Sequence, residues 1–295
     1  MKIIEMTPRH LTATLSLIRE IEYDPTPDTD WLRYRTLDDP TCSPDLLLLA
    51  EVEDRVMGLC FGCVRENKGV IKLFGTRPAY RRRGLANRLL DEIEARFAAR
   101  GIKSILVGAL GPNYFEPGID ISDTASVALL MRRGYETDRV SRVDMEVDLH
   151  RLALDTRRDI ARLSDQGIEI RRASHNDVDA AAQFALETFS EGWRLEALDT
   201  KRFSPPPMFI ALDQARVVGF AVYDVCGLGR FGPTGTHPDY CHRGIGSTLL
   251  RLCLDSIKAR GESVAEIRWA GPVDFYARAV DARIHRVFWA FDKKI

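Results

Sequence analysis

The sequence repeats itself at a constant offset of 160 residues, and this repeat limits the possible folds more than any other feature. Residues 74–86 and 234–246 share a Gly-Thr pair, then Pro, Tyr and Arg-Gly at the same spacing. The matching residues are Gly75, Thr76, Pro78, Tyr80, Arg83 and Gly84 in the first stretch, and Gly235, Thr236, Pro238, Tyr240, Arg243 and Gly244 in the second. Chance similarity does not hold register in this way, so we predict two copies of one structural unit of roughly 130–150 residues.

The boundary between the copies is expected near residue 150. We assign residues 1–150 to an N-terminal domain (the first repeat) and residues 167–295 to a C-terminal domain (the second repeat). Between them, residues 151–166 mix Arg and Asp with a few apolar residues and contain no Pro or Gly-Ser run. This composition favours a short linking helix on the surface over a flexible tether.

Each repeat begins with strands and ends with helix–strand units, which predicts a mixed α/β sheet with helices on its faces. In the first repeat we expect strands at 2–6, 46–51, 56–64, 70–76, 104–109 and 142–148, and helices at 8–21, 87–100 and 124–133. In the second repeat we expect strands at 168–171, 208–212, 217–223, 230–236, 264–269 and 287–293, and helices at 177–190, 247–260 and 273–279. The long helix of each repeat carries apolar residues at helical spacing.

Composition excludes several classes of protein. The 42 Lys and Arg residues against 43 Asp and Glu residues argue against a general nucleic-acid binder and a polybasic membrane-surface protein. No apolar run reaches the ~18 residues that a membrane span needs, and the first residues read as a strand rather than a signal peptide. Six cysteines are too few for a disulfide scaffold. We therefore expect a cytoplasmic monomer or homodimer, with Cys60 and Cys63 as buried strand residues rather than metal ligands.

The turn between strand 70–76 and helix 87–100 is the segment most informative about chemistry. Glycine there lets the backbone approach a ligand closely, and the helix that follows presents free N–H groups and a positive dipole end. Together these features predict an anion site suited to a pyrophosphate. The candidate binding residues are Thr76, Arg81, Arg82, Arg83, Gly84, Leu85 and Ala86 in the first repeat, and Thr236, His242, Arg243, Gly244, Ile245 and Gly246 in the second. A tight turn with exposed arginines is the alternative.

At these residues the chain resembles the GNAT superfamily of acetyl-CoA-dependent N-acetyltransferases. The family signature is Arg/Gln-x-x-Gly-x-Gly/Ala after a strand that ends in an x-Pro turn. Arg81, Gly84 and Ala86 fit it fully, whereas the second repeat keeps both glycines but has Cys241 at the Arg/Gln position. The resemblance implies two GNAT-like domains in tandem, acetyl-CoA as co-substrate and no metal. It also implies direct attack on the thioester by a primary amine of a small-molecule acceptor.

The resemblance also places the acid that protonates the leaving thiolate. Many GNAT members use a Tyr on the helix after the fifth strand, and Tyr276 stands at this position in the second repeat. Leu130 stands there in the first repeat and cannot donate a proton. We therefore predict that the second repeat is catalytic and that the first binds CoA or supports it. A packed core tyrosine is the alternative for Tyr276. No general base is evident, because Asp224 and Glu266 are expected to be exposed charged residues.

Two other functions remain open from the sequence: a non-catalytic acetyl-CoA-binding protein, and a module in which one half only supports the other. The aromatic residues Tyr114 and Phe115 lie in a Pro- and Gly-bounded segment, 111–118, that suits either local packing or a substrate wall. Trp193 is expected in the core. The sequence does not name the acceptor amine.

Overall fold

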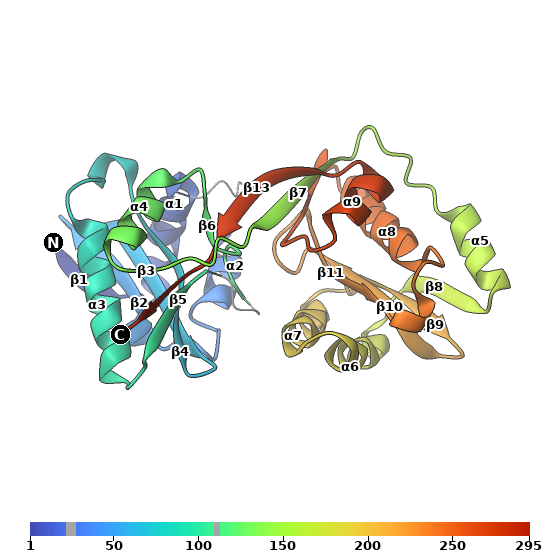
Figure 1. Ribbon diagram of the computed structural model, residues 1–295, viewed down its shortest axis with the longest axis horizontal. Helices are drawn as coiled ribbons and strands as arrows, with labels where there is room; N and C mark the ends of the chain where they lie inside the picture. The colour runs from blue at the N-terminus through green and yellow to red at the C-terminus, as the bar shows by residue number, and fades with distance from the viewer. Residues whose placement is uncertain (22–27, 109–112) are drawn as a thin grey trace. The chain divides into compact units, whose positions relative to one another are not determined.

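The computed structural model describes residues 1–21, 28–108 and 113–295, which form two compact units (Figure 1). The first unit consists of Met1–Arg142 together with Val287–Ile295, and the second consists of Val143–Arg286. Residues 109–112 include the end of the expected strand 104–109 and the start of the aromatic segment 111–118, and these positions lie outside the described residues.

The first unit contains a six-stranded sheet in the order β1-β2-β3-β4-β5-β14. Its strands are β1 (Lys2–Glu5), β2 (Leu47–Val52), β3 (Arg55–Arg65), β4 (Lys68–Thr76), β5 (Ser104–Val107) and β14 (Phe291–Lys294). Its helices are α1 (Leu11–Ile21), α2 (Thr29–Arg35), α3 (Leu85–Ala99) and α4 (Thr124–Arg132). The short strand β6 (Ile119–Asp120) pairs with Phe288 and Trp289 at the end of β13 (Arg283–Trp289).

The second unit repeats this plan with strands in the order β7-β12-β11-β10-β9-β8. Its strands are β7 (Arg142–Asp148), β8 (Ile168–Arg172), β9 (Met208–Asp213), β10 (Arg216–Tyr223), β11 (Arg230–Thr236) and β12 (Val264–Ile267). Its helices are α5 (Arg157–Asp165), α6 (Val178–Thr188), α7 (Glu191–Asp199), α8 (Ile245–Ala259) and α9 (Val273–Val280). The mixed α/β architecture predicted from the sequence is therefore confirmed.

Period-two alternation along β2 divides the core of the first unit into two layers. Leu47 and Leu49 pack with residues of α1 and α2, whereas Leu48 and Ala50 pack with residues of α3. The helices consequently cover opposite faces of the sheet (Figure 1). In the second unit, α6 and α7 form one such layer against β9 and β10.

The last strand of each repeat lies in the unit built mainly from the other repeat. β7 comes from the first repeat and pairs antiparallel with β12, with Val147 opposite Ala265. β14 comes from the second repeat and pairs antiparallel with β5, with Phe291 opposite Val107. The domains expected at 1–150 and 167–295 therefore differ from the observed units at both ends. An alternating strand specifies which face is buried, but the pattern does not name the neighbouring strand.

Other differences concern short elements. Neither α2 nor α7 was expected, because α2 has only seven residues and α7 contains a glycine at its second position. The single strand expected at 287–293 is divided into β13 and β14 at Ala290. Helix α5 lies within 151–166, where the sequence suggests a linking helix.

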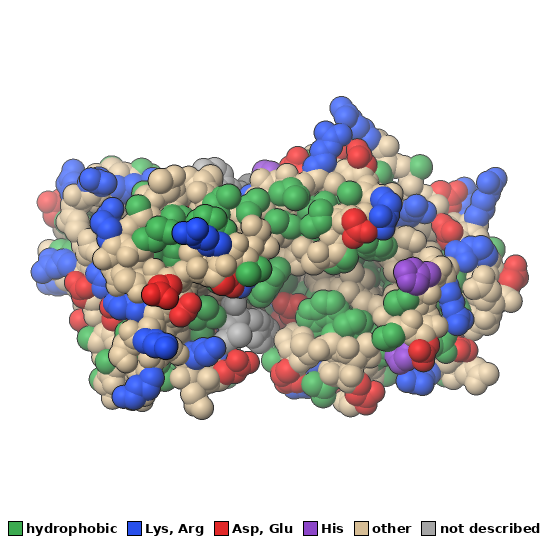
Figure 2. Space-filling model, viewed as in Figure 1, with side chains coloured by type: hydrophobic (Ala, Val, Ile, Leu, Met, Phe, Trp, Pro, Cys, Tyr) green, Lys and Arg blue, Asp and Glu red, His purple; other side chains and the backbone are tan. Residues whose placement is uncertain are grey.

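The surface carries both signs of charge. Figure 2 shows Lys and Arg side chains interspersed with Asp and Glu side chains over the face in view. This pattern agrees with the formal net charge of -1. Within the parts of the chain that the structure describes, every helix is too short or too polar to cross a membrane.

Candidate active site

The two signature loops have the same backbone conformation. Each begins with a 3-10 turn, Pro78–Tyr80 or Pro238–Tyr240, after the strand. Arg82 and His242 both have φ of 63°, and the N-cap glycines of the following helices have φ of 80° and 90°. A left-handed conformation at the N-cap favours glycine, which explains Gly84 and Gly244. The repeated sequence is therefore a repeated backbone turn.

The two loops present backbone N–H donors to a ligand, and few of the side chains at the start of the helices can contact it. Leu85 and Ile245 are buried and anchor the first turn of each helix, so they present only backbone to a ligand. The N-cap glycines carry no side chain that caps the helix, which leaves N–H groups at the start of α3 and α8 to an anion. Thr236 lies beside the second loop, because a Cβ on Gly246 would be 3.5 Å from its Oγ1.

The exposed side chains of the first loop are cationic. Arg81, Arg82 and Arg83 are all exposed, and the guanidinium of Arg83 lies 4.9 Å from the ring centre of Tyr80. Thr76 is buried at the end of β4, and Ala86 is half-buried in the first turn of α3. The predicted binding residues of the first repeat therefore lie together at one end of its sheet.

In each unit, a long strand is paired near its start with the end of a shorter parallel strand. β4 pairs with β5 through Gly69, Val70 and Ile71, and then continues to Thr76 beside β3 alone. β11 pairs with β12 through Arg230 and Phe231 only, and likewise continues beside β10. The parallel ladder thus ends several residues before the loop, where β5 and β12 themselves end, and β4 and β11 continue beyond them.

Tyr276 lies where β11 and β12 stop pairing. Its ring meets the ring of Phe231, the last paired residue of β11, edge to face at a centroid distance of 6.2 Å. The adjacent Phe275 reaches the loop, since a Cβ on Gly246 would be 3.7 Å from its Cζ. Tyr276 is 6% exposed, and its burial raises the pKa of the phenol above its ordinary value. Its hydroxyl makes no hydrogen bond to any residue that the structure describes, so it is a neutral phenol with its proton uncommitted.

The corresponding position in the first unit holds no acid. Leu130 is fully buried between α3 and the sheet. The nearby Tyr135 donates its hydroxyl proton to Glu94 at 2.9 Å and is not a substitute for Tyr276. The two units therefore differ in whether a hydroxyl is present at this point.

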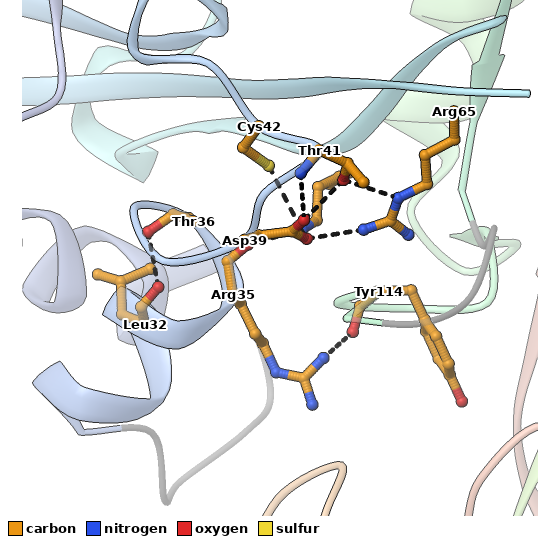
Figure 3. A network of polar contacts seen from close by, with 9 residues as sticks. Leu32, Arg35, Thr36, Asp39, Thr41, Cys42, Arg65 and Tyr114 are labelled. Atoms are coloured by element: carbon orange, nitrogen blue, oxygen red, sulfur yellow. Dashed lines mark hydrogen bonds and ion pairs between the residues drawn. The ribbon is translucent and has the colours of Figure 1, made fainter. Parts of the chain in front are cut away.

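A buried ionic network surrounds Asp39 in the first unit (Figure 3). Lys72 follows the last paired residue of β4, and its Nζ contacts Asp39 Oδ2 at 2.7 Å and the carbonyl of Arg35 at 2.6 Å. Arg65 also donates to Asp39 Oδ2 at 2.7 Å. Burial alone would raise the pKa of Asp39, but Lys72 and hydrogen bonds from Thr41 hold it below its ordinary value. Sequence reasoning missed this network, although a lone Lys in an apolar strand signals a buried charge that needs a partner.

The second unit has no lysine at the matching place, where the backbone carbonyl of Arg268 lies nearby and the Arg268 side chain forms a buried ion pair with Asp144 at 2.9 Å. The residue 160 positions after Lys72 is Gly232, which has no side chain. Phe189 and Trp193 are stacked at 4.6 Å, and a Cβ on Gly235 of β11 would lie 2.3 Å from Cζ of Phe189. Phe189 is 38% exposed, whereas Trp193 is half-buried and packs on the core as expected. This stretch of the second unit therefore presents aromatic rings.

The two carboxylates considered as bases are not the exposed groups that the sequence suggested. Asp224 is 5% exposed, accepts a hydrogen bond from the N–H of Gly229 and is paired with Arg260. Glu266 is only partly exposed and is paired with Arg230 at 2.9 Å. Their partners lie on a neighbouring strand and at the end of α8, far away in the sequence, so the local pattern did not show that these carboxylates are paired. Both carboxylates are committed to ion pairs.

Two further predictions concern local structure. Cys60 and Cys63 are both buried in β3, as predicted. Phe115 packs edge to face on Trp31 at 5.3 Å, and the backbone carbonyl of Tyr114 accepts a hydrogen bond from Arg35, so this part of segment 111–118 is local core. Among the described residues, no group of three or more His, Cys, Asp or Glu side chains is arranged to hold a metal ion.

Comparison with protein families gives two matches within the chain. Residues 12–115 and 178–280 each match the model described as the acetyltransferase (GNAT) family. Among curated proteins, 70 residues are 39% identical to Acetyltransferase SG1711 of Sodalis glossinidius and cover 24% of this chain and 49% of that protein. Acetyltransferase plu1384 of Photorhabdus laumondii is 37% identical over 67 residues, which cover 23% and 47%. The chain thus spans about half the length of these relatives.

Two solved structures are similar in fold over nearly the whole length of this chain. A GCN5-related N-acetyltransferase from Sphaerobacter thermophilus has a TM-score of 0.73 at 17% identity, over 99% of this chain and 95% of that one. A tandem GNAT protein from the clavulanic acid biosynthesis pathway has a TM-score of 0.72 at 13% identity, over 99% and 98%. At these identities the similarity concerns the fold, which is that of a tandem GNAT protein.

Proposed function

Because the chain belongs to the acetyltransferase (GNAT) family, we propose that it is an acetyl-CoA-dependent N-acetyltransferase. It transfers the acetyl group to a primary amine of a small-molecule acceptor by direct attack. The observation that carries the proposal is that a glycine turn suited to an anion follows β11 and an uncommitted phenol, Tyr276, packs on a residue of the same strand.

The donor is bound through its phosphates and its extended arm. The pyrophosphate of CoA accepts hydrogen bonds from backbone N–H groups at the start of α3 or α8, where the helix dipole favours negative charge. In the second unit the pantetheine arm then lies along β11 beyond the end of its ladder with β12 and brings the thioester toward Tyr276. Backbone binding of this kind needs the glycine turn more than any one side chain, and both loops have that turn.

The chemistry requires a neutral amine, a stabilised oxyanion and a proton for the departing sulfur. The amine nitrogen attacks the thioester carbon, and the C–S bond breaks as the amide forms. The sulfur takes a proton from the Tyr276 hydroxyl. The attacking nitrogen loses a proton, which water carries to the Tyr276 phenolate, and the phenol is restored. Burial raises the pKa of Tyr276, so the phenol is protonated at neutral pH when the sulfur needs it. Asp224 and Glu266 have no role as base in this scheme, because their partners hold them.

The reaction is assigned to the second unit, with the first unit binding CoA or supporting the fold. Two side-chain differences support this assignment. In the first unit Leu130 replaces the phenol, and Lys72, directly after the last residue of β4 that pairs with β5, forms a buried ion pair with Asp39. In the second unit the corresponding point is occupied by Gly232.

A Tyr276→Phe variant tests the proposal. General acid catalysis contributes ~10²–10⁴-fold, so turnover should fall by about that factor while CoA affinity stays within about twofold. Turnover is measured as thiol release from acetyl-CoA with a panel of small amines, and affinity by calorimetry. Tyr135→Phe is the matched control, because it removes the hydroxyl of a buried tyrosine from the other unit. It should leave turnover unchanged.

The results separate the proposal from its alternatives. Unchanged turnover in Tyr276→Phe would contradict the assigned acid. CoA binding without thiol release for any amine would favour a non-catalytic acetyl-CoA-binding protein. Absence of CoA binding in the unmodified protein would leave only a structural role for the two units.

A further inference from the structure

Helix α5 places an arginine on the second signature loop. Arg162 donates a hydrogen bond from Nη1 to the backbone carbonyl of Arg243 at 2.9 Å. Its Nη2 lies 2.6 Å from the position that a Cβ on Gly244 would occupy. The guanidinium therefore rests on the two residues that lead into α8. Its side chain is 44% exposed, so it meets solvent as well as the loop.

A carboxylate on the same helix orients this arginine. Asp159 forms an ion pair with Arg162 at 3.5 Å and a second with Arg251 of α8 at 3.2 Å. Leu163 anchors α5 because it is fully buried. A guanidinium has five N–H donors, which is more than the bonds to Arg243 and Asp159 use. The remaining N–H donors of Arg162 are therefore available to an anion at the start of α8.

The second loop has fewer cations of its own than the first. Cys241 and His242 stand where the first loop has Arg81 and Arg82. The remaining cation, Arg243, is turned back onto the 3-10 turn: its guanidinium lies 4.8 Å from the ring centre of Tyr240 and donates to the carbonyl of Asp239 at 3.1 Å.

We infer that Arg162 is a phosphate-binding residue of the second unit and supplies from α5 the cation that Cys241 and His242 do not. It donates a charge-assisted hydrogen bond to a phosphoryl oxygen of the CoA pyrophosphate while the loop N–H groups hold the other oxygens. The inference rests on the proposed function, since it adds a side chain to the donor site of that function. Helix α5, which lies between the repeats in the sequence, then also contributes a residue to CoA binding.

The test uses the full-length chain with Gly84→Asp, which removes phosphate binding at the first loop. In this background Arg162→Ala should weaken CoA binding roughly 10- to 100-fold, as expected for one hydrogen bond between charged groups. Arg162→Lys keeps the charge and should recover part of the loss. Arg158→Ala removes an exposed arginine from the same helix and should leave CoA affinity unchanged. Equal thermal unfolding temperatures show that the variants remain folded.

A donor without phosphates supplies the second readout. S-acetylpantetheine carries the thioester but no pyrophosphate, so its kcat/KM should be the same before and after the Arg162→Ala substitution. Unchanged or tighter CoA binding by Arg162→Ala would overturn the inference, as would an equal loss with both donors. If Gly244→Asp also leaves CoA binding intact, the donor site itself is wrong and the inference falls with it. Loss with Gly244→Asp but not with Arg162→Ala overturns the role of Arg162 alone.

Discussion

The exchange of final strands predicts that stability crosses the sequence repeat. Phe291 belongs to the second repeat but is fully buried in the core of the first unit, beside residues of α3 and α4. Met145 belongs to the first repeat but is 1% exposed on β7, opposite Ile267 in the second unit. Phe291→Ala should therefore weaken the first unit, and Met145→Ala should weaken the second.

The sizes of these effects follow from the burial of the two side chains. Truncation of a buried Phe to Ala costs about 3–5 kcal/mol, and truncation of a buried Met costs about 2–5 kcal/mol. Domains are stable by only about 5–15 kcal/mol, so either change removes a large share of one unit's stability. Lys294→Ala is the control, because Lys294 is an exposed residue of the same strand as Phe291. It should change stability by less than about 0.5 kcal/mol.

Native-state hydrogen exchange resolved by peptide distinguishes the two units. Phe291→Ala should lower the protection of β2, β3 and α3, and Met145→Ala should lower the protection of β9, β10 and α8. The opposite pattern, in which each variant loosens its own repeat, would refute the strand exchange. If each variant lowered the protection of both units equally, the two units would not open independently of one another.

Three other predictions concern the site and the buried network. At Gly84 φ is +80° and a Cβ meets nothing within 4 Å, so Gly84→Asp strains the turn by about 1–2 kcal/mol without a clash. It should still abolish CoA binding at that loop in a calorimetric titration. Gly235→Ala displaces the ring of Phe189 in the second unit, to which the reaction is assigned, and should lower kcat/KM, whereas Gly75→Ala makes the same clash with Ile21 in the first unit and should leave kcat/KM unchanged. Asp39→Asn leaves Lys72 buried without its counter-charge and should cost about 3–5 kcal/mol in urea unfolding at pH 7. The pKa of Asp39 is lowered in the folded state, so its contribution is complete above the unfolded value of about 4 and is lost as the pH falls through the folded value. The difference between Asp39→Asn and the unmodified chain should accordingly shrink in acid.

The features that could be predicted from the sequence are those that depend on local backbone geometry. Gly84 and Gly244 are needed by a left-handed N-cap, and a glycine at a strand-to-helix junction signals such a turn without knowledge of the rest of the fold. The long amphipathic helices were predictable for a similar reason, because helical spacing is a local property. Local geometry thus explains why the loops and most elements were found.

The missed features depend on partners far away in the chain. The alternation in β7 and β14 shows that each strand has a buried face, but it fits either sheet equally well. Lys72 is visible as a charge in an apolar strand, yet Asp39 lies 33 residues earlier in a segment with no periodic pattern. The ion pairs that bury Asp224 and Glu266 likewise join residues that are distant in sequence. Such pairings are fixed by tertiary packing.

The two units have kept the same backbone turn while their side chains diverged. A phosphate site made of N–H groups and a glycine tolerates the change from Arg81 to Cys241, because the lost side chain supplies only one contact among several. Replacement of the proton donor, by contrast, abolishes proton donation, since Leu130 has no hydroxyl in place of that of Tyr276. Under the proposed function, donor binding can therefore persist in both units after the chemistry has been confined to one. The buried ion pair of Lys72 and Asp39 then has a structural role, because the first unit no longer needs an open path to a thioester.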